Sequence, residues 1–275
     1  MLVAIPAFAA AAGAQANPAA LDRIVQADPT DIAGQDDAAA RLVVGMHYVV
    51  PPFVGGSKVR TPEAIDTALA EELAAKVQAQ LLAVPGKTAI QQSAGWKTPE
   101  PRLALAAIGP DDKVPASFVS VPTGYAAGPM AIMRTDTDIK SWQQLKGRTV
   151  CLSEGGRYVG ALTRQYGAVE IVFKAPADSL LALRTGGCDA AVHDDVMLKE
   201  LLKLPEWKKF SASLPPGPAA PLTFVLRADD ARTLAVLKGL TREWKATRHL
   251  AALTRKRVRD IAFEVYLDQV VADCH

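Results

Sequence analysis

Residues 145–195, LKGRTVCLSEGGRYVGALTRQYGAVEIVFKAPADSLLALRTGGCDAAVHDD, decide the fold of this chain. A short β-favouring run at 149–152 is followed by a polar turn with two glycines at 153–156, and a helical pattern runs over 158–166. A second strand and a second helix come next, and the apolar run 188–195 closes the stretch with two carboxylates. The order strand, turn, helix, strand, helix, strand is typical of an α/β unit with parallel strands.

This unit is expected to bring two opposite charges to one edge of its sheet. Backbone N–H groups of a glycine turn beside a helix start favour an anion, and Gly155 and Gly156 form such a turn. Asp194 ends a neighbouring strand, and ligands of open α/β sheets bind at the carboxyl ends of the strands. The pattern therefore predicts a site that holds both ends of a small zwitterion.

The composition fits a globular protein. The chain has 275 residues, of which 49% are hydrophobic and 22% charged, and this is enough for one large domain or two smaller ones. The formal net charge of +2 gives no reason to expect nucleic acid or an acidic membrane as a partner.

The N-terminal residues are interpreted as an export signal. Residues 1–16, MLVAIPAFAAAAGAQA, are small and apolar and end in an A-x-A cleavage pattern, and 17–40 form an irregular leader. No Lys or Arg precedes Arg23, so either translation begins further upstream, which we expect, or these residues are only an alanine-rich tail. An exported, periplasmic location follows from this interpretation.

Three cysteines occur, at 151, 188 and 274. Cys151 lies on the first strand of the unit and Cys188 begins the last, so a disulfide between them is the leading prediction for an exported chain. Two buried free thiols are the alternative, and Cys274 would be the odd one. No His or Cys pair has the spacing of a zinc site, so no metal is predicted.

The chain as a whole predicts an α/β protein of two lobes, each a mainly parallel sheet flanked by helices, with a ligand cleft between them. The first lobe would comprise 41–132 and 225–275, and the second 133–224, with crossovers near 130–135 and 221–227. A helix is predicted over 61–77, where Thr61 would cap the helix, and a loop over 118–125, which contains a proline and a glycine.

Four segments resemble the extracytoplasmic solute-binding proteins of ABC transporters, in the family that takes polar amino acids. They are LVVGMHYVVPPF from Leu42, AIDTALAEELAAKV from Ala64, IKSWQQLKGRTVCLSEGG from Ile139 and LLALRTGGCDAAVHDD from Leu180. The resemblance covers nearly everything after Arg41. It implies a periplasmic binding protein of type 2 fold that delivers a solute, an amino acid or a related compound, to a membrane permease as a monomer without a cofactor.

The resemblance also implies roles for individual residues. Tyr48 and Phe53 match the aromatic loop that stacks on the ligand. The turn that holds an α-carboxylate matches Gly155, Gly156 and Arg157, and Asp194 matches the partner of the α-ammonium group.

One part of the family pattern is missing. The arginine that usually follows the third strand has no counterpart between Gly109 and Lys113, where the sequence reads GPDDK. Either Lys113 replaces it as a point charge or Arg157 supplies the guanidinium from the other lobe. A solute that is not an ordinary α-amino acid is the third possibility.

Two other functions compete with solute capture. An enzyme on the same fold, similar to a cyclohexadienyl dehydratase, would use Glu154, His193 or Asp194 as acid or base. His193 precedes Asp194 on a strand and should point to the opposite face, which favours a structural histidine. A ligand-sensing module is the other alternative. The sequence lacks the common nucleophile, phosphate-binding and dinucleotide-binding motifs, so we expect a binding protein and not an enzyme.

Overall fold

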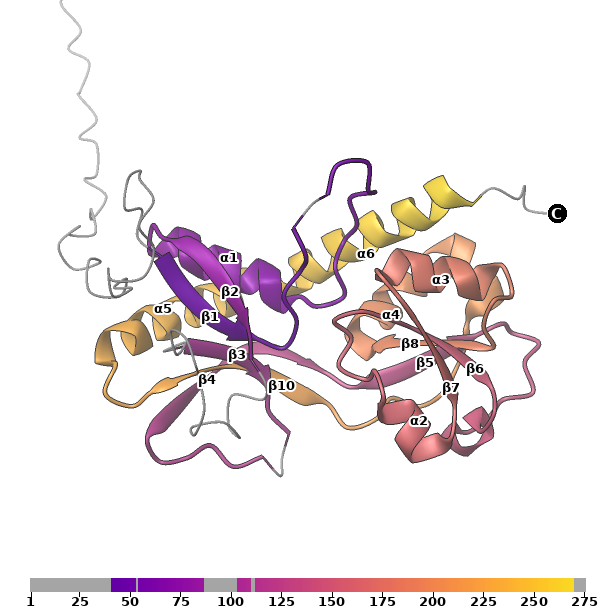
Figure 1. Ribbon diagram of the computed structural model, residues 1–275, viewed down its shortest axis with the longest axis horizontal. Helices are drawn as coiled ribbons and strands as arrows, with labels where there is room; N and C mark the ends of the chain where they lie inside the picture. The colour runs from indigo at the N-terminus through magenta and orange to yellow at the C-terminus, as the bar shows by residue number, and fades with distance from the viewer. Residues whose placement is uncertain (1–40, 53, 87–102, 110–111, 270–275) are drawn as a thin grey trace, which may run out of the picture.

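The computed structural model describes residues 41–52, 54–86, 103–109 and 112–269, which fold into two lobes that lie side by side (Figure 1). Each lobe is built on a five-stranded sheet with helices packed against it. The expected α/β fold with two lobes is confirmed. The sheets are mixed and not mainly parallel, because each contains two parallel and two antiparallel pairs of strands.

The first sheet has the strand order β2-β1-β3-β10-β4. Its strands are β1 (Arg41–Met46), β2 (Gln80–Pro85), β3 (Leu103–Ala107), β4 (Phe118–Ala127) and β10 (Ala220–Arg227). The helices α1 (Asp66–Lys76) and α5 (Ala231–Thr247) pack against it. One apolar cluster joins these elements, with Leu69, Leu73 and Phe224 fully buried. His47 follows β1 directly and so lies at the carboxyl edge of a strand.

The second sheet has the order β7-β6-β8-β5-β9. Its strands are β5 (Pro129–Met133), β6 (Thr149–Ser153), β7 (Val169–Phe173), β8 (Ala190–Asp194) and β9 (Ala212–Ser213). The helices α2 (Ala161–Tyr166), α3 (Pro176–Arg184) and α4 (Asp195–Leu201) belong to this lobe, with the 3-10 turns Trp142–Leu145 and Pro205–Phe210. The predicted strand and helix order of the 145–195 unit is therefore observed.

Cys151 and Cys188 form the predicted disulfide, with their Cα atoms 5.8 Å apart. Cys151 lies on β6 and pairs with Ala191 of β8, and Cys188 lies just before β8. Adjacent parallel strands thus bring both sulfurs into one apolar cluster. Cys274 lies outside the described residues.

The helix α6 (His249–Asp268) extends from the first lobe to the second, as Figure 1 shows in yellow. It packs against α5 on one side and against α3 and α4 on the other. Its buried residues Val258, Ile261 and Val265 belong to the core of the second lobe. The last helix therefore joins the two lobes, whereas we had expected the C-terminal residues to belong to the first lobe alone.

Two local expectations were wrong. The expected loop at 118–125 is the strand β4, where Pro122 is tolerated because β4 is the edge strand of its sheet. The helix expected from Thr61 begins only at Asp66. Thr61 donates to Glu264 of α6 through both its backbone nitrogen (2.9 Å) and its hydroxyl (2.7 Å). Arg257 donates to the carbonyl oxygens of residues 62–64. In a longer helix these oxygens would instead accept hydrogen bonds from backbone N–H groups of the next turn.

The chain passes between the lobes twice. It leaves β4 at Ala127 and enters β5 at Pro129, and it returns between Ser213 and Ala220. Gly217 donates to the carbonyl oxygen of Pro129 at 2.8 Å, so the two crossings touch. The crossovers expected at 130–135 and 221–227 lie a few residues further along the chain than these changes of sheet.

The proposed signal at 1–16 and the leader at 17–40 lie outside the described residues. Of the helices in the described ranges, none combines the length and the apolar character needed to cross a membrane.

Candidate functional site

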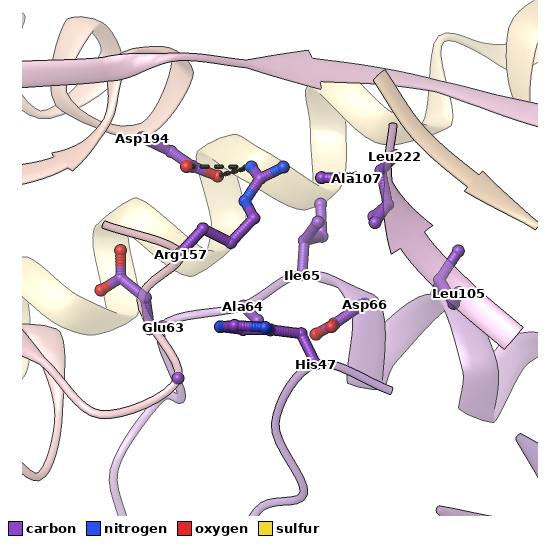
Figure 2. Close-up of a pocket in the computed structure, with 11 residues that line it drawn as sticks. His47, Glu63, Ala64, Ile65, Asp66, Leu105, Ala107, Arg157, Asp194 and Leu222 are labelled. Atoms are coloured by element: carbon purple, nitrogen blue, oxygen red, sulfur yellow. Dashed lines mark hydrogen bonds and ion pairs between the residues drawn. The ribbon is translucent and has the colours of Figure 1, made fainter. Parts of the chain in front are cut away.

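A cavity lies between the lobes at the carboxyl ends of their strands. The first lobe contributes His47 after β1, the start of α1 and apolar side chains of β3 and β10, and the second lobe contributes Gly155, Arg157 and Asp194. Figure 2 shows these side chains converging from both lobes. This part of the cavity measures about 20 Å³, room for a single water molecule. An adjoining cavity of about 250 Å³ shares His47, Leu105, Ala107 and Arg157.

Arg157 and Asp194 form an ion pair within this cavity. The Nη2 atom of Arg157 donates to both carboxylate oxygens of Asp194, at 2.8 and 3.0 Å. The two side chains are 19% and 13% exposed, so water screens the pair only weakly. Burial lowers the pKa of Arg157, but the charge and hydrogen bond of Asp194 together with the two neighbouring tyrosines outweigh burial and raise that pKa above its ordinary value. Arg157 therefore stays cationic at every physiological pH.

Two tyrosines complete the surroundings of Asp194. Tyr125 of β4 donates to Oδ2 and Tyr158 donates to Oδ1, each at 2.7 Å. Burial raises the pKa of both phenols, and the charge of Asp194 raises it further, so both remain donors. Tyr125 comes from the first lobe and Asp194 from the second, which makes this hydrogen bond a contact across the cleft.

A second guanidinium nitrogen of Arg157, Nη1, is buried and has no hydrogen-bond acceptor among the described residues. Figure 2 shows the guanidinium with one nitrogen toward Asp194 and the other turned toward Ala107. A buried donor of a cation without an acceptor is costly, and an anionic ligand atom in the cavity would remove that cost.

Tyr48 contacts the glycine turn. Its hydroxyl donates to Glu154 Oε2 at 3.1 Å, which joins the lobes near the surface. Gly155 has φ +77°, and a Cβ atom there would lie 2.6 Å from Tyr48 Cδ1, so only glycine fits beneath the ring. Tyr48 is not among the described residues that line either cavity.

The other described residues that were predicted to bind the ligand do not point their donors into these cavities. The backbone N–H of Gly156 donates to the carbonyl of Ser153 at 3.0 Å, so it is not directed at a ligand. Gly109 donates to Asp112 Oδ2 at 2.7 Å, and Lys113 is exposed. Neither Gly109 nor Lys113 is among the described residues that line these two cavities. Phe53 lies outside the described residues.

His47 and Asp66 line the cavity and were not predicted from the sequence. Burial lowers the pKa of His47, and the charge of Arg157 lowers it further, so the imidazole is neutral at pH 7. Burial raises the pKa of Asp66 to about 6, against the lowering effect of its hydrogen bond with Thr67 and of the charge of Arg157. His47 comes directly after a buried strand, and this position is a signal for a ligand-binding residue. Asp66 lies in an ordinary amphipathic helix pattern, so no such signal marks it in the sequence.

Glu63 reaches from the start of α1 into the second lobe. Its Oε2 atom lies 2.8 Å from His193 Nδ1 and accepts from Ser153 Oγ at 2.5 Å. The other ring nitrogen of His193 lies 2.7 Å from Ser179 Oγ. His193 is fully buried, as expected from its place on a strand. Within the described residues, no group of three or more His, Cys, Asp or Glu could hold a metal ion.

Comparison with known proteins gives structural matches only. No protein-family model matches the chain, and no curated protein matches it in sequence. The P235GK mutant of ArgBP from T. maritima is 22% identical, with a TM-score of 0.51 over 80% of this chain and 95% of that one. AbpA of Streptococcus pneumoniae, an amino acid ABC transporter substrate-binding protein bound to L-arginine, is 16% identical, with a TM-score of 0.51 over 80% and 95% of the two chains.

A third match is an ancestral cationic amino acid solute binding protein, AncCDT-1. It is 20% identical, with a TM-score of 0.51 over 79% of this chain and 95% of the other. At these identities the matches define the architecture alone. The chain has the two-lobed fold that these solute-binding proteins share.

Proposed function

We propose that this protein captures a small polar solute, an amino acid or a related compound, in the cleft between its lobes and delivers it to an ABC permease. The fold supports this proposal, because its structural matches include substrate-binding proteins of amino acid transport. In this proposal the protein works outside the cytoplasm, as a monomer and without a cofactor.

The observation that carries the proposal is the buried, unpartnered Nη1 of Arg157 in a cavity to which both lobes contribute. A carboxylate of the solute would accept from this nitrogen in a poorly solvated place, where charge-assisted hydrogen bonds are strong. Arg157 would thereby supply the guanidinium that is missing after β3. Gly155 would keep the turn close to Tyr48, and Asp194 would hold Arg157 in position beside the solute.

The groups considered as acids and bases for an enzyme have other contacts. His193 is buried between Glu63 and Ser179, Glu154 accepts from Tyr48, and Asp194 accepts from Arg157 and two tyrosines. These contacts favour solute capture without chemistry over the enzyme.

A thermal melt with a panel of amino acids tests the proposal. A member that binds should stabilise the protein by about 2.7 kcal/mol at one hundred times its dissociation constant, and mass spectrometry should recover it unchanged. Turnover of the stabilising compound would replace the proposal with the enzyme. Stabilisation by other small solutes alone would show that the solute is not an amino acid.

A further inference from the structure

Besides Asp194 and Glu63, the cavity contains the carboxylate of Asp66, whose charge has no direct partner among the described residues. Asp66 begins α1 and is 4% exposed. Its Oδ1 atom accepts from the backbone N–H of Thr67 at 2.9 Å. Across the described part of the chain, no side chain donates to it. Figure 2 shows its carboxylate beside His47, on the first-lobe side of the cavity.

The carboxylate of Asp194, by contrast, can accept few further hydrogen bonds. Arg157 and the two tyrosines make four contacts with its two oxygens, at 2.7 to 3.0 Å. A carboxylate offers about four lone-pair sites, so these contacts fill it. An ammonium group arriving at Asp194 would have to displace an arginine or a tyrosine.

Several charged or titratable groups face Asp66, and none of them forms an ion pair with it in the described residues. They are His47 after β1, Glu63 before α1, Arg157 of the second lobe and Arg257 of α6. Arg157 already pairs with Asp194, and Arg257 donates to backbone carbonyls of residues 62–64. Burial makes the ionised form of Asp66 costly, and a cation placed against the carboxylate would offset this cost.

The two cavities also restrict the body of a solute. The cavity next to Asp194 has room for one water only, so the body must lie in the adjoining 250 Å³. The residues that line it include Met46, Ala104, Leu105, Ala106 and Ala107, and it shares His47 and Arg157 with the first cavity. None of the described residues of its wall carries a carboxylate, so this part of the wall offers no partner to a cationic side chain of the solute.

We propose that Asp66 receives the cationic group of the solute while Arg157 Nη1 receives its anionic group. The solute is then a zwitterion with an uncharged body that lies along β3. This inference rests on the proposed capture of a small solute, and it assigns the cation to Asp66 of the first lobe instead of Asp194. Asp194 becomes a positioning residue that acts through Arg157.

The test compares amino acids with carboxylic acids that lack only the amino group. L-leucine with 4-methylpentanoic acid and L-glutamine with 4-carbamoylbutanoic acid are titrated into the wild type, Asp66→Asn and Asp194→Asn. The wild type should prefer the amino acid at least tenfold. Asp66→Asn should lose most of this preference, because an amide cannot pair with the ammonium group, whereas Asp194→Asn should keep the preference even where its affinity falls.

Three controls make the outcome decisive. In Asp66→Asn the amide oxygen of the new side chain can still accept from Thr67, and melts without solute check that both variants fold. Binding to the wild type should weaken as the pH falls from 7.5 to 5.5, and Asp66→Asn should lose this dependence. L-arginine and L-glutamate should bind less tightly than L-glutamine.

A preference retained in Asp66→Asn and lost in Asp194→Asn would overturn the inference and leave solute capture intact. Failure of every amino acid to bind the wild type would overturn the inference, and failure of every small solute to bind would overturn the proposed capture as well.

Discussion

Arg157 is the central residue of the proposed solute site, and residues of both lobes fix the orientation of its side chain. Asp194 holds one of its nitrogens, and Tyr125 and Tyr158 hold Asp194 in turn. A planar guanidinium held at one nitrogen presents the other in a fixed direction, which a lysine could not do. The arrangement reduces the entropy lost when a solute binds, since the donor is already in place.

Gly155 should tolerate no side chain. Gly155→Ala must hold a positive φ, which costs about 1–2 kcal/mol, and its Cβ must also displace the Tyr48 ring. Gly147→Ala is the matched control, since Gly147 has φ +72° but no atom within 4 Å of the added Cβ. Urea denaturation should show a larger loss of unfolding free energy for Gly155→Ala than for Gly147→Ala. Equal losses would mean that the ring moves aside without cost.

Asp66 should reduce stability at neutral pH. Its pKa rises from 3.8 in the unfolded chain to about 6 in the folded protein, so folding favours the protonated form. The stability contribution of this group therefore falls as the pH rises from about 4 to above 6. Asp66→Asn should be more stable than the wild type at pH 7.5, by on the order of 3 kcal/mol, and the gain should disappear near pH 3.5. A gain independent of pH, measured by chemical denaturation, would show that ionisation is not the cause.

At the scale of elements, the segment from Lys58 to Ile65 attaches the first lobe to the second. Arg60 pairs with Asp178 of α3 and Asp268 of α6, and Thr61 bonds Glu264. Glu63 then enters the second lobe beside His193. In Figure 1 the loop between β1 and α1, of which this segment is the last part, rises from β1, passes α6 and returns to α1. Any opening of the cleft must break these contacts or carry the segment along with the second lobe.

Glu63 should be a major contributor to stability. Burial alone would raise its pKa, but the charge and hydrogen bond of His193 bring that pKa below its ordinary value of 4.5. Its contribution is therefore complete above pH 4.5 and is lost as the pH falls through the lower folded pKa. Glu63→Gln removes the buried carboxylate that accepts from Ser153 and contacts His193, and it should cost about 1–3 kcal/mol at pH 7.

Urea denaturation at pH 7 and at acid pH measures this effect. Glu243→Gln serves as the control, because the pair of Glu243 with Lys76 is exposed and should contribute less than about 1 kcal/mol. A loss in Glu63→Gln no larger than in this control would mean that the buried contact does not hold the lobes together.

The sequence predicted the elements well where one local pattern decided them. The unit at 145–195 combines apolar strands, glycine turns and a proline-started helix, and the disulfide followed from the strand order. Prediction from the sequence failed where residues far away in the chain decide where an element begins. The late start of α1 depends on Arg257 and Glu264 of α6, nearly 200 residues away, and no local pattern records these contacts.

The same limit applied to the site. Arg157 and Asp194 could be placed at one sheet edge from the strand order, but their mutual ion pair could not, because it depends on side-chain directions. Asp66 lies within the helix predicted over 61–77, where nothing in the local sequence marks it as a ligand-binding residue. Only the packing of the two lobes shows that it is buried in a cavity.

At the scale of the whole molecule, two crossings and one long helix control how the lobes can move. Gly128 and Gly217 let the crossings pass against each other, since a Cβ atom at either glycine would overlap the other strand. Hinge closure around a ligand needs a few residues that absorb the motion, and these crossings are the expected hinge. The helix α6 must then slide on the second lobe or move with it.

The binding of one amino acid at Arg157 is the central claim, and isothermal titration calorimetry tests it directly. The amino acid that stabilises the protein most is titrated into the wild type, Arg157→Gln and Arg148→Gln, which removes an exposed arginine paired with Asp138. We predict saturable binding of one solute per chain for the wild type and Arg148→Gln, and at least a hundredfold loss for folded Arg157→Gln. Binding to Arg157→Gln with the affinity of the wild type would contradict the account.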